Sequence, residues 1–421
     1  MSPRRLHLQI ICKSGASIER ILASWGTLPL VVRFKGGLKS TLLPKNIAIA
    51  LRHPDRVREI DLGLTSTTVG SIVDAIKKPF QILERIRIAI KDATGPPLPF
   101  GNAFLGGSAP RLREIALDGI SFPFPEIKQV ISTNNLVELH LLRIPKTGYF
   151  SADALVTALS TSAELRRLEL SFHYPASLPT QSKTSPPLQR TTFPFLQHLE
   201  FHGASEYLED FVSRVDFPSL SFINIKLFNQ IFFEIPQFCR SISLLNAFKS
   251  PAEAWIGLHP KVATMYFKQK GKRGTKSGVC YLKTVCERLD WKLSFLTQVS
   301  SQLSLPLKSV GTLEVYVSLE SCLDDGFDET TLVSREDHAD ATQWVELFQP
   351  FAHARLLRVP GIPVRSIVQA LATEDMAAGV LPELTQLLFF GWFCHNPPVV
   401  EAAQQFVAAR KLSGRTIYLS I

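Results

Sequence analysis

Apolar residues recur through the first half of the chain in a six-residue pattern, apolar-x-x-apolar-x-apolar. Seven copies are Val57-x-x-Ile60-x-Leu62, Leu83-x-x-Ile86-x-Ile88, Leu112-x-x-Ile115-x-Leu117, Leu136-x-x-Leu139-x-Leu141, Leu165-x-x-Leu168-x-Leu170, Leu196-x-x-Leu199-x-Phe201 and Leu220-x-x-Ile223-x-Ile225. Subtracting successive first positions gives steps of 26, 29, 24, 29, 31 and 24 residues. The alternation that closes each copy predicts a strand, because side chains on a strand point alternately to its two faces.

A second pattern lies between the copies and predicts helices. Val69, Ile72, Val73 and Ile76 follow the first copy at i, i+3, i+4 and i+7, which is one face of a helix. Similar faces follow later copies at Ile127, Val130 and Ile131, at Leu155, Ala158 and Leu159 after a capping Ser151, and at Leu208, Phe211 and Val212 after Ser205. Strand and helix repeated at this period are the signature of leucine-rich repeats. We therefore predict an α/β leucine-rich-repeat solenoid (a horseshoe) with a parallel inner sheet and outer helices.

The patterns divide the chain into four segments. Residues 1–50 form an N-terminal cap segment with strand-like stretches near Leu8 and over Leu28 to Phe34. Regular repeats occupy 51–230, with an insertion rich in Pro, Ser and Thr at 173–192. Irregular repeats fill 231–396, where candidate strands lie at 262–267, 310–315, 354–359 and 384–389, with a basic turn at 268–276 and an acidic loop at 320–340. A C-terminal cap, 397–421, has a helix that Gly414 ends and a last strand.

The composition indicates where in the cell the protein resides, but it says less about what the protein does. The net charge of +9 is small for 421 residues and comes partly from the basic turn, so it does not indicate a nucleic-acid partner. Six scattered cysteines without a C-x-x-C pair indicate reduced thiols in the cytoplasm or nucleus. No uninterrupted apolar stretch of about 18 residues predicts a membrane span, and the first residues lack the apolar core of a signal peptide.

The polar positions around the central apolar residues of each copy should lie together on the concave face of the sheet, opposite the helices. They are Glu59, Asp61, Arg85, Arg87, Glu114, Asp118, Glu138, His140, Arg167, Glu169, His198, Glu200, His202, Phe222, Asn224 and Lys226. Because neighbouring strands lie about 4.8 Å apart, we expect lateral pairing of Arg85 with Glu59 and Glu114, and of Arg87 with Asp61. Two interpretations stay open. The charges form a self-satisfied ladder in which each exposed pair contributes roughly 0–1 kcal/mol, or the ladder also contacts a protein partner.

The sequence predicts no catalytic, metal or cofactor site, and hence no enzyme. His198, Glu200 and His202 resemble a ligand set, but four residues of a strand span roughly 13 Å, too far for one ion with ligands about 2 Å away. His140, placed on the neighbouring strand, could approach only one of these histidines. The basic turn lacks the Gly-Lys pair of a phosphate-binding loop, because Thr275 precedes Lys276. G-x-S-x-G and H-E-x-x-H are absent from the sequence.

Several segments together resemble a known family. They are PRRLHLQI, HPDRVREIDL, FLGGSAPRLREIALDGI, GASEYLEDFVSRVDFPSL, WVELFQPF and FVAARKLSG. They are similar, in the same order and across essentially the whole chain, to the F-box/leucine-rich-repeat proteins of mushroom-forming fungi. In that family an F-box ahead of the repeats docks the adaptor of a Skp–cullin–F-box ubiquitin ligase, and the repeats hold the substrate.

The chain departs from this family at its start, since no Leu-Pro-rich three-helix segment precedes Pro3. We expect the F-box to be missing, and the ligase adaptor to be a partner only if an F-box is encoded upstream of Met1. The resemblance implies a protein–protein recognition module like the substrate-binding part of an F-box receptor, with an unknown protein ligand. The alternative is a free-standing structural or scaffold interaction protein without a link to ubiquitination.

Overall fold

The computed structural model of the 421-residue chain divides into two compact units. The first comprises residues 1–203 and 213–219, and the second 204–212 and 220–421. The residues that the structure describes are 8–11, 18–24, 26–34, 42–91, 104–120, 124–173, 189–228, 235–259, 261–269, 277–286, 288–317, 341–360, 367, 371, 380–390 and 397–421. The basic turn at 270–276, the acidic loop at 320–340 and most of the 173–192 insertion lie outside them.

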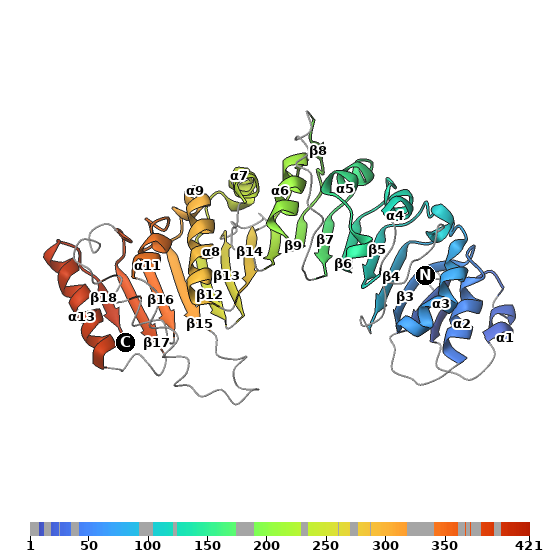
Figure 1. The fold of residues 1–421 in the computed structure, drawn as a ribbon, viewed down its shortest axis with the longest axis horizontal. Helices are drawn as coiled ribbons and strands as arrows, with labels where there is room; N and C mark the ends of the chain where they lie inside the picture. The colour runs from blue at the N-terminus through green and yellow to red at the C-terminus, as the bar shows by residue number, and fades with distance from the viewer. Residues whose placement is uncertain are drawn as a thin grey trace, which may run out of the picture. The chain divides into compact units, whose positions relative to one another are not determined.

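The first unit is built on a parallel sheet (Figure 1). Its strands, in spatial order, are β1 (Leu8–Ile11), β2 (Leu30–Phe34), β3 (Val57–Leu64), β4 (Arg85–Ile90), β5 (Glu114–Asp118), β6 (Glu138–Ile144), β7 (Arg167–Phe172) and β9 (His198–Gly203). Each neighbouring pair is parallel. The predicted parallel strands of this segment are therefore confirmed. A short two-stranded sheet joins β8 (Thr191–Thr192) to β10 (Val215–Asp216).

The same hydrogen bond recurs at the start of successive copies. The backbone N–H one residue after the first motif position donates to the carbonyl of the equivalent residue in the preceding copy. The donor–acceptor pairs are Glu84 to Arg58, Arg113 to Glu84, Val137 to Arg113, Arg166 to Val137 and Gln197 to Arg166, at 2.8–2.9 Å. This repeated backbone bond gives all these strands the same register.

Helices lie between the strands of the first unit and cover one face of its sheet (Figure 1). They are α1 (Ile18–Ser24), α2 (Leu42–Leu51), α3 (Ser66–Val73), α4 (Phe124–Ile131) and α5 (Ala152–Leu159), with 3-10 turns η1 (Asp74–Lys77), η2 (Phe104–Gly107) and η3 (Lys146–Gly148). The Ser151 hydroxyl accepts from the backbone N–H of Ala154 at 3.2 Å, which confirms the predicted cap of α5. Helix α6 (Ser205–Arg214) begins at the serine expected to cap it.

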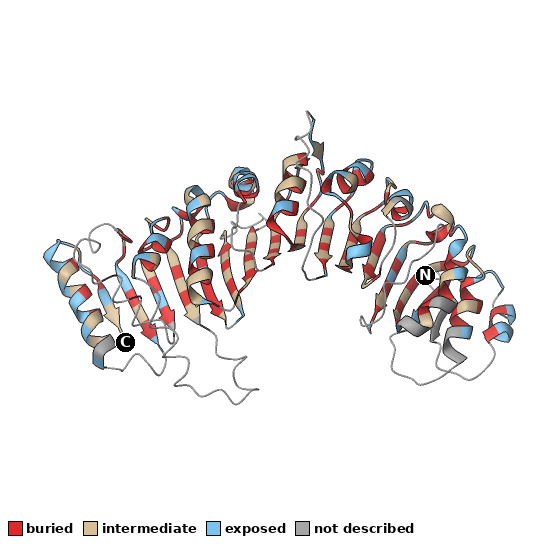
Figure 2. Ribbon diagram, viewed as in Figure 1, coloured by how far each residue is buried: buried red, intermediate tan, exposed pale blue. Residues whose placement is uncertain are grey.

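The core lies between the sheet and these helices. All three apolar positions of all seven copies are at most 3% exposed. Ile72 and Ile76 are buried at 1% from the helix side, and the alternation of buried and part-exposed residues along each strand is visible in Figure 2. Burying such a side chain stabilises the fold by roughly 1.5–3 kcal/mol. The repeat pattern is thus the pattern of the core.

The second unit has a mixed sheet rather than the purely parallel one predicted. Its strands, in spatial order, are β11 (Phe222–Leu227), β14 (Val279–Val285), β13 (Val262–Lys268), β12 (Glu253–His259), β15 (Thr312–Val317), β16 (Leu356–Pro360), β17 (Gln386–Phe390) and β18 (Tyr418–Ser420). The candidate strands of the irregular repeats are confirmed, but β13 runs antiparallel to both β12 and β14. Its short connections explain this, because a parallel neighbour needs a crossover of a dozen or more residues.

Helices also line one face of the second sheet (Figure 1). They are α7 (Pro236–Leu244), α8 (Leu289–Gln302), α9 (Ser304–Leu307), α11 (Ala341–Phe348) and α13 (Pro397–Leu412), with η4 (Asn246–Phe248). Glu209 caps α7 by accepting from the backbone N–H groups of Gln237 and Phe238, both at 2.9 Å. Gly414 follows α13 with φ +75°, as expected for a glycine that ends a helix. No helix in the described part of the chain is long and apolar enough to cross a membrane.

Gly278→Ala should destabilise the second unit. A Cβ at Gly278 would lie 1.9 Å from the carbonyl oxygen of Ala247, so the backbone before β14 would have to move. We expect a loss of about 1–3 kcal/mol, as for an overpacked core, measured by chemical denaturation. Gly311→Ala is the matched control, because Gly311 also precedes a strand but its Cβ would meet nothing closer than 3.9 Å. Equal stability of the two variants would contradict the packing of β14 against Ala247.

Candidate functional site

The face of the first sheet that no described helix covers carries two rows of polar side chains, which we call the polar face. Strand register places Glu59, Arg85, Glu114, Glu138, Arg167 and His198 in one row. The second row contains Asp61, Arg87, Ala116, His140, Glu169 and Glu200. These rows contain the predicted residues of this unit except Asp118 and His202, which lie one strand period further along, where Asp118 is aligned with Ala89 and His202 with Ser171. Phe222, Asn224 and Lys226 lie on β11 of the second unit.

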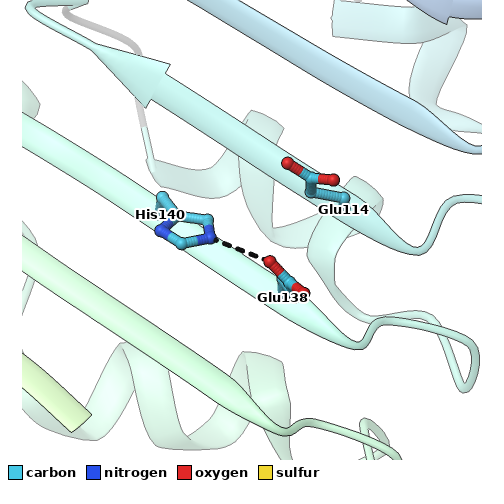
Figure 3. Close-up of side chains that lie close together, drawn as sticks. All are labelled: Glu114, Glu138 and His140. Atoms are coloured by element: carbon cyan, nitrogen blue, oxygen red, sulfur yellow. Dashed lines mark hydrogen bonds and ion pairs between the residues drawn. The ribbon is translucent and has the colours of Figure 1, made fainter. Parts of the chain in front are cut away.

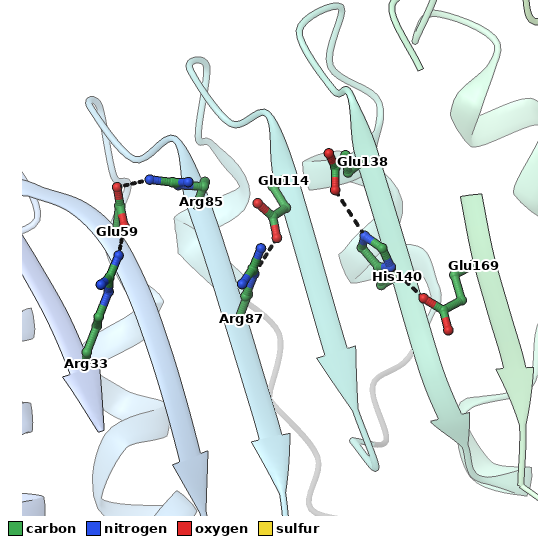
Figure 4. Close-up of polar contacts among 8 residues, drawn as sticks. All are labelled: Arg33, Glu59, Arg85, Arg87, Glu114, Glu138, His140 and Glu169. Carbon is green, nitrogen blue, oxygen red and sulfur yellow. Dashed lines mark hydrogen bonds and ion pairs between the residues drawn. The ribbon is translucent and has the colours of Figure 1, made fainter. Parts of the chain in front are cut away.

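Glu59 is the most buried acid of the polar face, with a side chain only 9% exposed. It accepts hydrogen bonds from Arg33 at 2.9 Å and from Arg85, so two guanidinium groups flank one carboxylate (Figure 4). Burial by itself would raise the pKa of Glu59, but the bonds from Arg85 and Arg33 outweigh it and lower that pKa below its ordinary value. The predicted pair of Glu59 and Arg85 is confirmed.

In the other two predicted pairs, Arg87 with Asp61 and Arg85 with Glu114, the arginine instead binds an acid on its other neighbouring strand. Arg87 is aligned with Asp61, but its guanidinium donates to Glu114 on the opposite side (Figure 4). Arg85 is aligned with Glu114, but it binds Glu59. The Glu114 side chain is 10% exposed and so is costly to leave without a cation. The hydrogen bond to Glu114 raises the pKa of Arg87, which stays charged. Each of the two buried acids, Glu59 and Glu114, thus has an arginine partner.

His140 joins two acids. Its Nδ1 lies 2.7 Å from Glu169 on β7, and its Nε2 lies 3.4 Å from Glu138 on its own strand (Figure 4). Burial lowers the pKa of His140, but the hydrogen bonds to Glu169 and Glu138 and their charges raise it overall. The imidazolium form compensates part of the negative charge that Glu114, Glu138 and Glu169 bring to neighbouring strands.

Three of these side chains could also hold a cation. Glu114, Glu138 and His140 each offer a ligand atom, and these atoms lie within 4.8 Å of one another (Figure 3). Glu169 would then orient the imidazole from the second shell. Arg87 already binds Glu114, however, so a cation would have to displace the Arg87 guanidinium from this buried carboxylate. The arrangement therefore fits a charge network better than a metal centre.

The histidine set considered from the sequence is not assembled as expected. His140 was placed on the strand beside His198 and His202, but β7 lies between β6 and β9. His140 instead faces Glu169 of β7. The copy Leu165-x-x-Leu168-x-Leu170, which forms β7, already separates the copies of β6 and β9 in the sequence, so the placement of His140 beside the β9 histidines was wrong.

The structure adds two arginines that were not predicted for this face. Arg33 on β2 binds Glu59, and its place in a strand-like stretch could have indicated it. Arg143 binds Asp118 and donates to the carbonyl oxygen of Ile90 at 2.7 Å. Its backbone has φ +46°, at a register shift of β6, and no motif in the sequence marks that shift.

The cysteines of the described chain give no nucleophile at this face. Cys239, Cys280 and Cys286 are buried free thiols of the second unit, which agrees with the reduced state predicted for them. Burial raises the pKa of Cys239 and of Cys280, so both thiols stay protonated at neutral pH.

No protein-family model matches the chain. A comparison with curated proteins also finds no match.

Arg85→Glu should lower thermal stability. The new carboxylate would stand in register between Glu59 and Glu114 and replace an attraction by two repulsions. We expect a loss of about 1 kcal/mol that shrinks at high salt, measured by thermal melting. Arg111→Glu makes the same change at an exposed residue outside the polar face. An unchanged melting temperature for Arg85→Glu would contradict the assignment of Arg85 to this face.

His140 should make stability depend on pH. Its pKa is raised on folding, so its contribution is complete below the unfolded value of about 6.5 and is lost as pH rises through the folded value. The stability difference between the native chain and His140→Gln should therefore shrink from pH 6 to pH 9, measured by denaturant titration. His173→Gln, at an exposed histidine, serves as the control. A difference that grows with pH would show that His140 is not held charged by Glu138 and Glu169.

Proposed function

We propose that the chain is a leucine-rich-repeat solenoid of horseshoe form, and that the polar face of its first unit recognises a protein partner. The observation that carries this proposal is the alignment of charged side chains across six parallel strands on the face without described helices. Loops and helices can vary while such a sheet stays rigid, so its face offers fixed positions for a partner's charges. In solenoids the concave surface is commonly the one that binds.

The distribution of charge indicates which part of the polar face is open to a partner. Glu59 and Glu114 are satisfied internally by arginines. On β7, Arg167 is part-exposed, and no ion pair of the described residues joins it to its aligned neighbour Glu138. We infer that the ion pairs on β3 to β5 mainly stabilise the sheet, whereas Arg167 on β7 and side chains of β9 such as Glu200 contact the partner.

The resemblance to F-box/leucine-rich-repeat proteins gives the first cellular role: a substrate-binding module like that of a ubiquitin-ligase receptor. The second role is a free-standing scaffold without a link to ubiquitination. Both place the protein in the cytoplasm or nucleus. Neither role involves catalysis.

Arg167→Ala combined with Glu200→Ala should abolish capture of protein partners without unfolding the chain. The tagged full chain would be isolated from its source cells and the bound proteins identified by mass spectrometry. The matched control combines Arg52→Ala with Lys128→Ala, two exposed residues on the helix side. Partners retained by the control and lost from the double variant support the proposal, and equal capture by both contradicts it. Recovery of the ligase adaptor would separate the first role from the second.

A further inference from the structure

A row of aromatic side chains crosses the second sheet on the face without described helices. We define this aromatic row as Phe222 on β11, Tyr281 on β14, Tyr266 on β13 and Trp255 on β12. The ring centroids of successive members are 6.2, 4.7 and 5.4 Å apart. The antiparallel β12–β13 hairpin creates this row, because it aligns Tyr266 with Trp255 on one side and with Tyr281 on the other.

These rings do not belong to the core. The residues that alternate with them, such as Ile256, Met265 and Leu282, are at most 1% exposed and face the helices. Trp255 is 51% exposed, and the other three rings are only partly covered. A contiguous aromatic surface is costly to leave in water, and such surfaces commonly mark binding sites.

Positive charge lies along one side of the aromatic row. Lys226 on β11 is aligned with Lys283 on β14. Each lysine lies two residues, or about 6.6 Å, further along its strand than the aligned pair Asn224 and Tyr281. The ammonium group of Lys283 lies 5.1 Å from the centre of the Tyr281 ring. Their two ammonium groups are the positive charges that an anionic ligand would meet beside the Phe222 and Tyr281 rings.

Negative charge lies at the Trp255 end of the row, where the exposed Glu253 precedes Trp255 by two residues on the same face of β12 and is aligned with Lys268. Glu314 on β15 is aligned with Trp255, and its carboxylate is 3.9 Å from Arg358. A ligand on the aromatic row must therefore place its anions near the lysines and its hydrogen-bond donors near Glu314. A ribose 2′-hydroxyl is such a donor, and deoxyribose lacks it.

We propose that the aromatic row binds single-stranded RNA. Bases stack on the row, phosphates contact Lys226 and Lys283, and Glu314 accepts from a ribose hydroxyl. Aromatic side chains on a sheet beside basic residues suit unpaired bases, whose flat faces are free to stack. An acidic peptide would satisfy the lysines but leave the rings bare. The inference rests on this local geometry rather than on net charge, and it is independent of the function proposed for the first unit.

The test is fluorescence anisotropy of labelled U8 and A8 oligonucleotides with the full chain. We expect saturable binding to both, since stacking tolerates any base. Each neutralised phosphate contributes about −0.7 to the slope of log affinity against log salt for single strands. Two lysine contacts therefore predict roughly sevenfold weaker binding when salt rises from about 50 to 200 mM.

Variants separate stacking from charge. Trp255→Ala should weaken binding by roughly 5- to 150-fold, the loss for one stacked base, while Trp255→Phe should restore most of it. Lys226→Gln should reduce the salt slope by about 0.7. The matched controls are Leu305→Ala, an exposed apolar residue of the helix layer, and Lys249→Gln, an exposed lysine. Thermal melting of each variant checks that the fold is kept.

The proposal is overturned if neither oligonucleotide binds, or if Trp255→Ala and Lys226→Gln bind as the native chain does. Binding of a poly-glutamate peptide in place of RNA would also overturn it and assign the surface to an acidic protein. Equal affinity for dT8 and U8 would remove the role of Glu314 and the assignment to RNA. None of these results affects capture of protein partners through Arg167 and Glu200.

Discussion

The structure of the first unit depends on one repeated register. The hydrogen bond that starts each copy, from the residue after the first motif position to its equivalent in the copy before, aligns all that follows. It places the next apolar residues, such as Leu139 and Leu168, side by side in the core. It also places Glu138 beside Arg167 on the other face. The core and the polar face therefore both follow from the strand register. If a strand shifted by one residue against its neighbour, its core residues would move to the polar face and its polar residues to the core.

Charge on the polar face follows burial rather than simple alignment. Glu59 and Glu114 are the acids closest to the sheet, and each draws an arginine whether or not that arginine is its aligned neighbour. His140 then lies between Glu138 and Glu169, which form no hydrogen bond with an arginine among the described residues. Such a network stabilises the sheet, while the part-exposed Arg167 on β7 offers its charge to a partner. Stability and recognition can thus occupy neighbouring parts of one surface.

The sequence predicts the parts of the structure that depend on local periodicity. The strands, their parallel pairing and the buried positions of each copy, Leu199 for example, follow from the motif itself. The repeat motif does not predict the direction of β13 or the presence of β12, although the alternation of Ala254, Ile256 and Leu258 is itself typical of a strand. The aromatic row was missed for the same reason. Its members meet only through antiparallel register, which a repeat count cannot supply.

The most direct test of this account is cross-linking in register. Gly63 and Ala89 are aligned on β3 and β4, on the polar face of the sheet, at a spacing that a disulfide can bridge. The pair Gly63→Cys and Ala89→Cys should oxidise readily in the folded full chain and be identified as a linked peptide by mass spectrometry. The pair Gly63→Cys and Arg87→Cys, two residues out of register, should not. Equal linkage of both pairs, or linkage of the second alone, would contradict the register on which the polar face depends.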